Sequence, residues 1–255
     1  MMMKYIGTII LTVLCIGVLI AGQMHWTDKI EQASTVKATS TEKKVTTTNK
    51  KLPFQKVKDP ELKGTMELAA WEHGSARILI AGSDSMGTDE EGLAEQLSKK
   101  LKKAYGDAVK VKHLQYDGNS IDFLAENMVE DYVDFKPDVF IYEPLLLNSN
   151  GVEDAVMTTN DMIDIVLEAL QAENENLYTI LTPPNPIYGA TYYPREVEDL
   201  KEYAEQQDIT YVDHWSAWPN HQSEEIIEYL NDAQSAPNEK GQEIWADEIL
   251  TLFGL

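Results

Sequence analysis

The chain has 255 residues, with 21 Lys and Arg against 43 Asp and Glu, and a net charge of −22 at pH 7. Residues 1–64 carry 10 basic and 5 acidic side chains, whereas residues 65–255 carry 11 and 38. An acidic body repels polyanions, so we expect no nucleic-acid partner. Cys15 is the only cysteine, which excludes a disulfide within the chain and leaves the core alone to stabilise the fold.

Residues 5–24 are uncharged and almost wholly apolar. About 20 helical residues at 1.5 Å each match the ~30 Å hydrocarbon layer of a membrane, so we predict one transmembrane helix. Lys4 precedes this segment and Asp28 follows it, which favours a cytoplasmic amino terminus and an extracytoplasmic remainder. We predict an uncleaved single-pass anchor in the cell membrane. A cleaved signal peptide, with Ala21 and Gly22 as a cleavage cue, is the alternative and would release a secreted protein.

Residues 27–66 are rich in Ser, Thr and Lys, and they offer few apolar side chains to bury. Such a composition does not offset the entropy lost on ordering a chain. We therefore predict an anchor or signal over residues 1–26, a flexible linker over 27–66 and a folded domain over 67–255. We also expect residues 27 to about 60 to be dispensable, so that a body starting near Lys63 melts at the temperature of the longer protein.

The predicted domain alternates between two periodicities. Short aliphatic and β-branched runs predict five strands, at residues 78–81, 109–114, 139–142, 177–181 and 209–212. Apolar side chains at helical spacing lie between them, as at Leu93, Leu97 and Leu101. This alternation predicts an α/β fold of three layers, α/β/α, with a mostly parallel five-stranded sheet.

The first predicted strand ends in Ser83-Asp84-Ser85-Met86-Gly87. Ligands and reacting groups gather beyond the carboxyl ends of the strands in an open α/β sheet, so Ser85 is the predicted nucleophile. The alternative is that these small polar residues only turn the chain and cap the next helix.

Gly118 follows the second predicted strand, and Asn148 follows the third. A glycine N–H and an amide side chain are donors that stabilise the negative oxygen formed during acyl transfer. Each is also common in ordinary turns. Because parallel strands end at the same edge, we predict that Ser85, Gly118 and Asn148 converge there.

These segments resemble the sequence blocks of the SGNH, or GDSL-type, hydrolases. Ser83-Asp84-Ser85-Met86 is similar to Gly-Asp-Ser-Leu, with serine in place of the glycine. The remaining blocks are similar to Gly118, to Pro137-Asp138-Val139-Phe140 leading to Asn148, and to the segment Pro237-Asn238-Glu239-Lys240-Gly241. The resemblance implies a flavodoxin-like sheet and a serine esterase. It also implies that Ser85 is the nucleophile and that the Ser85 N–H, the Gly118 N–H and Asn148 form the oxyanion site.

One departure bears directly on catalysis. Ala236 stands where the resemblance expects the catalytic histidine, and Asp232 lies one residue further back than the expected orienting acid. A serine hydroxyl without a base is a poor nucleophile at neutral pH. Either the chain has been altered at position 236, or another base such as His214 or His221 serves, or the fold now binds without turnover.

The sequence and the resemblance together predict a membrane-anchored extracytoplasmic esterase, or an O-acetyl transferase, acting on acyl (acetyl) esters of cell-envelope glycans. The alternative is a catalytically impaired module that binds envelope polysaccharide or protein. No phosphate-loop or dinucleotide motif and no metal-ligand spacing is present in the sequence, so we expect no cofactor and no metal.

Overall fold

The structure is a computed structural model that describes residues 53–87, 92–151 and 159–255. The predicted membrane segment, residues 5–24, lies outside the described residues, as does the linker up to residue 52. Within the described ranges, no helix is both long and apolar enough to cross a membrane.

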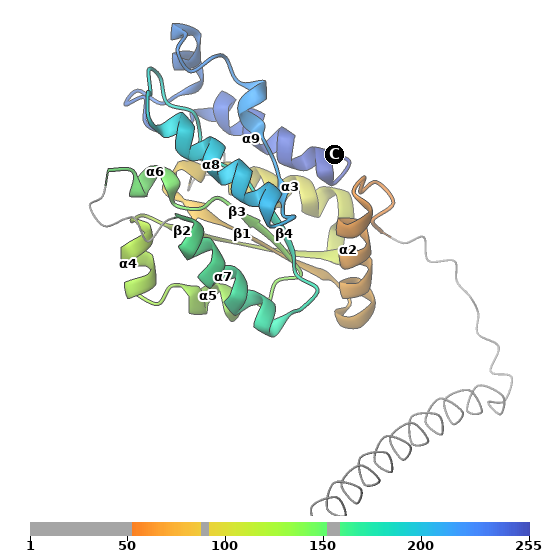
Figure 1. The fold of residues 1–255 in the computed structure, drawn as a ribbon. Helices are drawn as coiled ribbons and strands as arrows, with labels where there is room; N and C mark the ends of the chain where they lie inside the picture. The colour runs from red at the N-terminus through yellow and green to blue at the C-terminus, as the bar shows by residue number, and fades with distance from the viewer. Residues whose placement is uncertain (1–52, 88–91, 152–158) are drawn as a thin grey trace, which may run out of the picture. The chain divides into compact units, whose positions relative to one another are not determined.

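Among the described residues, five strands form one sheet in the order β2-β1-β3-β4-β5, and every neighbouring pair is parallel (Figure 1). The strands are β1 (Ala76–Ser83), β2 (Val109–Tyr116), β3 (Val139–Tyr142), β4 (Tyr178–Leu181) and β5 (Thr210–Tyr211). All five predicted strands are confirmed. The parallel arrangement brings their carboxyl ends to one edge of the sheet.

Helices cover both faces of the sheet. They are α2 (Pro60–His73), α3 (Leu93–Tyr105), α4 (Ser120–Ala125), α5 (Val129–Val133), α6 (Leu146–Ser149), α7 (Thr159–Glu173), α8 (Tyr193–Gln206) and α9 (Glu239–Leu252). Short 3-10 turns occur at η2 (Asp84–Met86), η3 (Gly106–Ala108), η4 (His214–Ala217) and η5 (Glu224–Tyr229).

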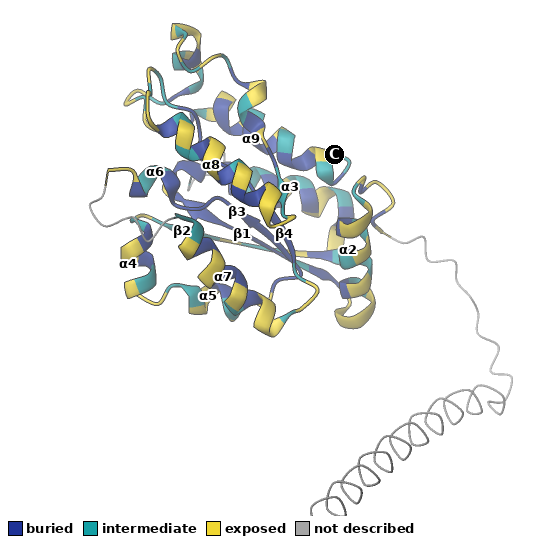
Figure 2. Cartoon of the chain, in the orientation of Figure 1, coloured by how far each residue is buried: buried dark blue, intermediate teal, exposed yellow. Residues whose placement is uncertain are grey.

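Alternate residues of β1 belong to two separate hydrophobic clusters. Ile78 and Ile80 pack with side chains of α2, α3 and α9, whereas Leu79 and Ala81 pack with those of α4, α5, α7 and α8. Successive strand residues point to opposite faces, and a strand covered on both faces is apolar throughout. Figure 2 shows the buried strands between helices whose outer faces are exposed. The predicted three-layer α/β/α architecture is therefore confirmed.

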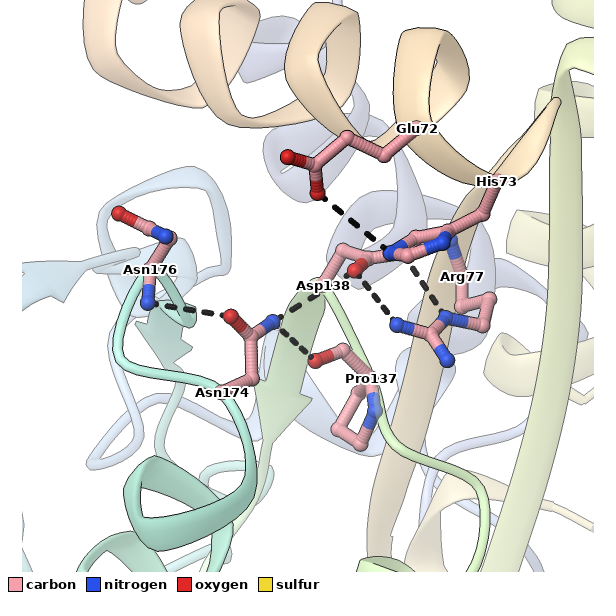
Figure 3. Close-up of polar contacts among 7 residues, drawn as sticks. All are labelled: Glu72, His73, Arg77, Pro137, Asp138, Asn174 and Asn176. Carbon is pink, nitrogen blue, oxygen red and sulfur yellow. Dashed lines mark hydrogen bonds and ion pairs between the residues drawn. The ribbon is translucent and has the colours of Figure 1, made fainter. Parts of the chain in front are cut away.

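A partly buried ion pair joins the amino ends of β1 and β3, at the edge of the sheet opposite Ser85 (Figure 3). Arg77 Nη2 lies 2.9 Å from Asp138 Oδ1, and Arg77 Nε lies 3.1 Å from Oδ2 of the same carboxylate. The backbone N–H of Arg77 also donates to Oδ2 at 2.7 Å. This bidentate contact holds the two strands in register.

The folded domain begins earlier than predicted. Phe54, Leu62 and Met66 have no exposed surface and belong to the cluster that contains α3 and α9. α2 starts at Pro60, and Asp59 caps it by accepting the Leu62 N–H at 2.8 Å. The prediction of a linker up to residue 66 is therefore wrong for residues 53–66. Their apolar side chains are few, but their spacing lets all of them face the core.

Candidate active site

Ser85 lies at the carboxyl end of β1, within the three-residue turn η2. Its side chain is nearly buried, and its Oγ lies 2.5 Å from Ser83 Oγ. Ser83 makes no capping hydrogen bond, and the next helix, α3, starts at Leu93 with Gly92 as its N-cap. The segment therefore does not cap α3, and Ser85 stands at the sheet edge where the sequence placed it.

A glutamine from α9 holds the backbone of this turn. Gln242 Nε2 donates to Ser85 O at 2.8 Å, and Gln242 Oε1 accepts the Leu93 N–H at 3.0 Å. Gln115, at the end of β2, donates through Nε2 to Gly87 O at 2.6 Å. The sequence interpretation missed both glutamines. The only available signal was the place of Gln242 in the first turns of the helix that follows the last sequence block.

The segments that carry Gly118 and Asn148 lie at the same edge. In the sheet register Ser83 is opposite Tyr116, two residues before Gly118. Asn148, in α6, directs its Nδ2 toward Asp84 Oδ1 at 3.5 Å, next to Ser85. Ser149 Oγ accepts the Ser120 N–H at 3.1 Å, which joins the segment after β3 to the segment after β2. The segments after β1, β2 and β3 therefore lie at one edge of the sheet. The convergence of Ser85, Gly118 and Asn148 on one substrate oxygen stays a prediction.

Gly118 also has a packing role. A Cβ added there would lie 2.5 Å from Cε1 of the Tyr116 ring, and that ring packs edge-on against Phe123 with centroids 5.3 Å apart. Glycine at this position therefore lets Tyr116 cover the core, whatever the Gly118 N–H does in catalysis.

Ala236 and Asp232 lie on the loop that leads into α9. Leu230 and Pro237 form an isolated antiparallel bridge, and the Asn231 N–H donates to Ala236 O at 2.8 Å. Asp232 is exposed on this loop. Position 236 leads directly into the helix that contacts Ser85 through Gln242.

His214 does not serve as the missing base. It is fully buried and stacks on Trp245, with ring centroids 4.6 Å apart. Trp218 Nε1–H donates to its Nδ1 at 3.0 Å, so Nε2 carries the proton and donates to Pro183 O at 2.9 Å. Burial lowers the pKa of His214 to about 3. Both nitrogens are occupied in the core, so the hypothesis that His214 is a base is wrong.

His221 is half-buried and lies beside the Trp215 ring, with centroids 5.9 Å apart. Its carbonyl accepts the Gly189 N–H at 2.9 Å. The side-chain hydrogen bonds found for Ser85 within the described part of the chain join it to Ser83 and Gln242, and none involves an imidazole.

The buried histidine predicts how stability depends on pH. The folded pKa of His214 is about 3 and its ordinary value is 6.5, so between these values the unfolded chain binds a proton that the folded chain excludes. Its contribution is therefore complete above pH 6.5 and is lost as the pH falls, with a slope of up to about 1.4 kcal/mol per pH unit. The free energy of unfolding is measured by urea at pH 7.0, 5.5 and 4.5. We expect it to fall less steeply with decreasing pH in His214→Gln than in the unaltered chain. His113→Gln, at an exposed position of β2, is the control, and equal slopes in all three proteins would contradict this assignment.

Glu143 is a buried acid beside the candidate nucleophile. It follows β3 directly and has no exposed surface, and its Oε2 accepts the Ser83 N–H at 2.5 Å. Burial raises the pKa of Glu143 to about 8, although the hydrogen bonds from Ser83 oppose that rise. Sequence reasoning missed this residue, and its only signal was a charged side chain directly after an apolar strand.

Across the described residues, no group of three or more His, Cys, Asp or Glu side chains is placed to hold a metal ion.

No protein-family model and no curated protein matches the chain. Solved structures do match. A protein assigned as a GDSL-like lipase from Parabacteroides merdae has a TM-score of 0.58 at 15% identity, over 71% of this chain and 96% of that one. LAE5, an α/β hydrolase enzyme from the metagenome of Lake Arreo, has a TM-score of 0.54 at 17% identity, over 71% and 96%. Axe2, an acetylxylan esterase from Geobacillus stearothermophilus, has a TM-score of 0.52 at 18% identity, over 71% and 94%. The described domain therefore has the fold of the SGNH, or GDSL-type, hydrolases.

Proposed function

We propose that this chain is a membrane-anchored, extracytoplasmic serine esterase that acts on acyl esters, chiefly acetyl esters, of cell-envelope glycans. The observation that carries the proposal is the place of Ser85. It lies at the carboxyl end of β1 in an SGNH fold, and the segments of Gly118 and Asn148 lie beside it. A nucleophile at this edge has access to a ligand while the sheet holds it in place.

The proposed reaction is acyl transfer through Ser85. Its Oγ attacks the ester carbonyl, and the N–H groups of Ser85 and Gly118 with the Asn148 amide stabilise the negative oxygen. Loss of the alcohol leaves an acyl-serine. Water then hydrolyses this intermediate, or a sugar hydroxyl takes up its acyl group. The absence of a histidine at position 236 predicts slow turnover. Removing one triad member lowers kcat by about four to six orders of magnitude, and the remaining rate exceeds that of the reaction in water by roughly 10³ to 10⁴.

The substrate and the location rest on separate support. The matching structures include an acetylxylan esterase, which favours an acetylated glycan. The apolar segment over residues 5–24, with Lys4 before it and Asp28 directly after it, supports a tether that leaves the domain outside the membrane. A soluble acyl ester would reach Ser85 equally well. The proposal therefore commits first to the ester bond and only second to the glycan that carries it.

A second candidate function is an SGNH-fold binding module for envelope polysaccharide or protein. Ala236 favours it, because no hydrogen bond from an imidazole to Ser85 is found among the described residues. In this case the same edge of the sheet would hold a glycan without cleaving it.

Replacing Ser85 separates the two functions. We expect purified protein to hydrolyse p-nitrophenyl acetate slowly, and Ser85→Ala to lower this rate, because no other group would form the acyl intermediate. Ser216→Ala, at an exposed serine, is the matched control and should keep the rate. Two results together would favour the binding module. The rate of hydrolysis would be unchanged in Ser85→Ala, and the unaltered chain and Ser85→Ala would be retained equally on acetylated glycan.

A further inference from the structure

Ser83 lies between Ser85 and Glu143 in the buried interior: its hydroxyl contacts Ser85, and both its backbone N–H and its side chain interact with the Glu143 carboxyl group. Ser85 Oγ lies 2.5 Å from Ser83 Oγ, and the Ser83 N–H donates to Glu143 Oε2 at 2.5 Å. Ser83 and Glu143 have no exposed surface, and Ser85 has 4%. Ser83 stands where the family resemblance expects glycine, so its hydroxyl is a feature of this chain. We propose that Ser83 and Glu143 form a proton relay that takes the Ser85 proton in place of the histidine missing at position 236.

The backbone holds the carboxylate in this position. The Glu143 N–H donates to Ala81 O at 2.9 Å, which extends the pairing of β3 with β1 by one residue. Gly82 leaves room for the side chain, since a Cβ there would lie 2.6 Å from Glu143 Oε2. The close approach of the carboxylate to β1 therefore depends on a glycine two residues before Asp84.

The carboxyl group of Glu143 is not explained by packing. Its Oε1 has no hydrogen-bond partner, and none of the ion pairs found among the described residues includes it. A buried carboxylate without a cation costs several kcal/mol, whereas a glutamine would accept the Ser83 N–H without that cost. A buried polar atom without a partner calls for an explanation. Proton transfer is such an explanation, because a carboxylate can accept a proton and the amide of a glutamine cannot.

The groups around Glu143 oppose its ionisation. The negative charge of Asp84, from η2, raises the pKa of Glu143. Glu143 also interacts electrostatically with the side chains of Tyr132 from α5, Tyr142 from β3 and Tyr193 from α8. None of these groups is a cation at neutral pH. With a pKa of about 8, Glu143 is ionised, and so able to accept a proton, mainly at alkaline pH.

The relay balances without a further reactant. As the bond from Ser85 Oγ to the acyl carbon forms, the Ser85 proton moves to Ser83 Oγ and the Ser83 hydroxyl proton moves to Glu143. When the carbon–oxygen bond to the alcohol breaks, the alkoxide recovers a proton from Ser83, and Glu143 returns its proton to Ser83. Water repeats the sequence to release the acid. Ser83 contacts the nucleophile directly, and Glu143 acts only through it.

This inference rests on the proposed esterase function, and the experiment separates the two. The Ser85-dependent rate of p-nitrophenyl acetate hydrolysis is measured from pH 6 to 10, with Ser85→Ala subtracted at each pH. We expect the kcat of the unaltered chain to rise through about pH 8 and then level off. Glu143→Gln and Ser83→Ala should each lower the plateau at least about 10-fold and remove the rise near pH 8, and the double variant should lose no more than either single one.

Glu143→Asp and Ala236→His serve as the comparison proteins. Glu143→Asp keeps a carboxylate and should retain a pH-dependent rate. In Ala236→His an imidazole is available, so adding Glu143→Gln should lower the rate by a smaller factor than it does in the unaltered chain. An equal factor in both backgrounds, or a pH profile unchanged by Glu143→Gln, would overturn the relay and leave the esterase proposal standing. No Ser85-dependent hydrolysis in either background would overturn the esterase proposal itself.

Discussion

Ala236→His should raise the esterase activity of this chain by at least about 100-fold, a ~2.7 kcal/mol lowering of the barrier. The imidazole would stand directly before Pro237, on the segment that leads into α9, the helix that contacts the Ser85 turn through Gln242. There it would take the Ser85 proton during attack and return it to the leaving alcohol. Hydrolysis of p-nitrophenyl acetate at pH 7.5 measures the gain.

The loop is built to hold position 236 in place. The Asn231 side chain accepts the N–H groups of Ser235 at 3.1 Å and of Ala236 at 3.4 Å. Ala233→His, on the exposed part of the same loop, is the matched control and should give no gain. Adding Asp232→Ala to Ala236→His tests whether the exposed Asp232 orients the new ring, in which case part of the gain is lost.

Two results would contradict this expectation. Rapid Ser85-dependent turnover by the unaltered chain that disappears in His221→Ala would mean that His221 is a relocated base. No gain in a folded Ala236→His protein would mean that the oxyanion geometry has also changed, which favours the binding module.

Deleting the chain up to residue 62 should strongly destabilise the domain, contrary to the expectation from composition alone. The deletion removes Phe54, Val57 and Leu62 from the core and Asp59 from the N-cap of α2. Large-to-small changes at one such position cost about 2 to 5 kcal/mol, and whole domains are stable by only about 5 to 15 kcal/mol. We expect a protein starting at Lys63 to be largely unfolded at 37 °C, as measured by circular dichroism, and one starting at residue 52 to melt cooperatively.

A pair of point variants makes the same test without a deletion. Phe54 packs on Tyr105, with ring centroids 5.3 Å apart, and Tyr105 donates a hydrogen bond to Phe253 O. Phe54→Ala should cost about 3 to 5 kcal/mol and lower the melting temperature by roughly 10 °C. Gln55→Ala, at the neighbouring exposed position, should change it little. Equal melting temperatures for the two variants would show that residues 53–62 do not stabilise the domain.

The order of strands and helices followed from the sequence because each depends on local periodicity. The predicted runs 78–81 and 139–142, which lie within β1 and β3, are apolar throughout, as strands covered on both faces must be. The place of Ser85 beyond β1 also followed, because parallel strands end at one edge. Ala236 was recognised as a departure by its position relative to Pro237 and the last helix.

Contacts between distant parts of the chain were decided only by the tertiary structure. Glu143 is 60 residues from Ser83 and Gln242 is 157 residues from Ser85, so no local pattern pairs them. The start of the domain could not be predicted for the same reason. Phe54 and Leu62 are isolated apolar residues in a polar segment, and the residues that cover them belong to the distant helices α3 and α9. It also removed His214 as a base, because its two nitrogens are paired by Trp218 and Pro183 in the packed core. Burial is set by the whole fold, and burial determines which of these side chains can exchange a proton.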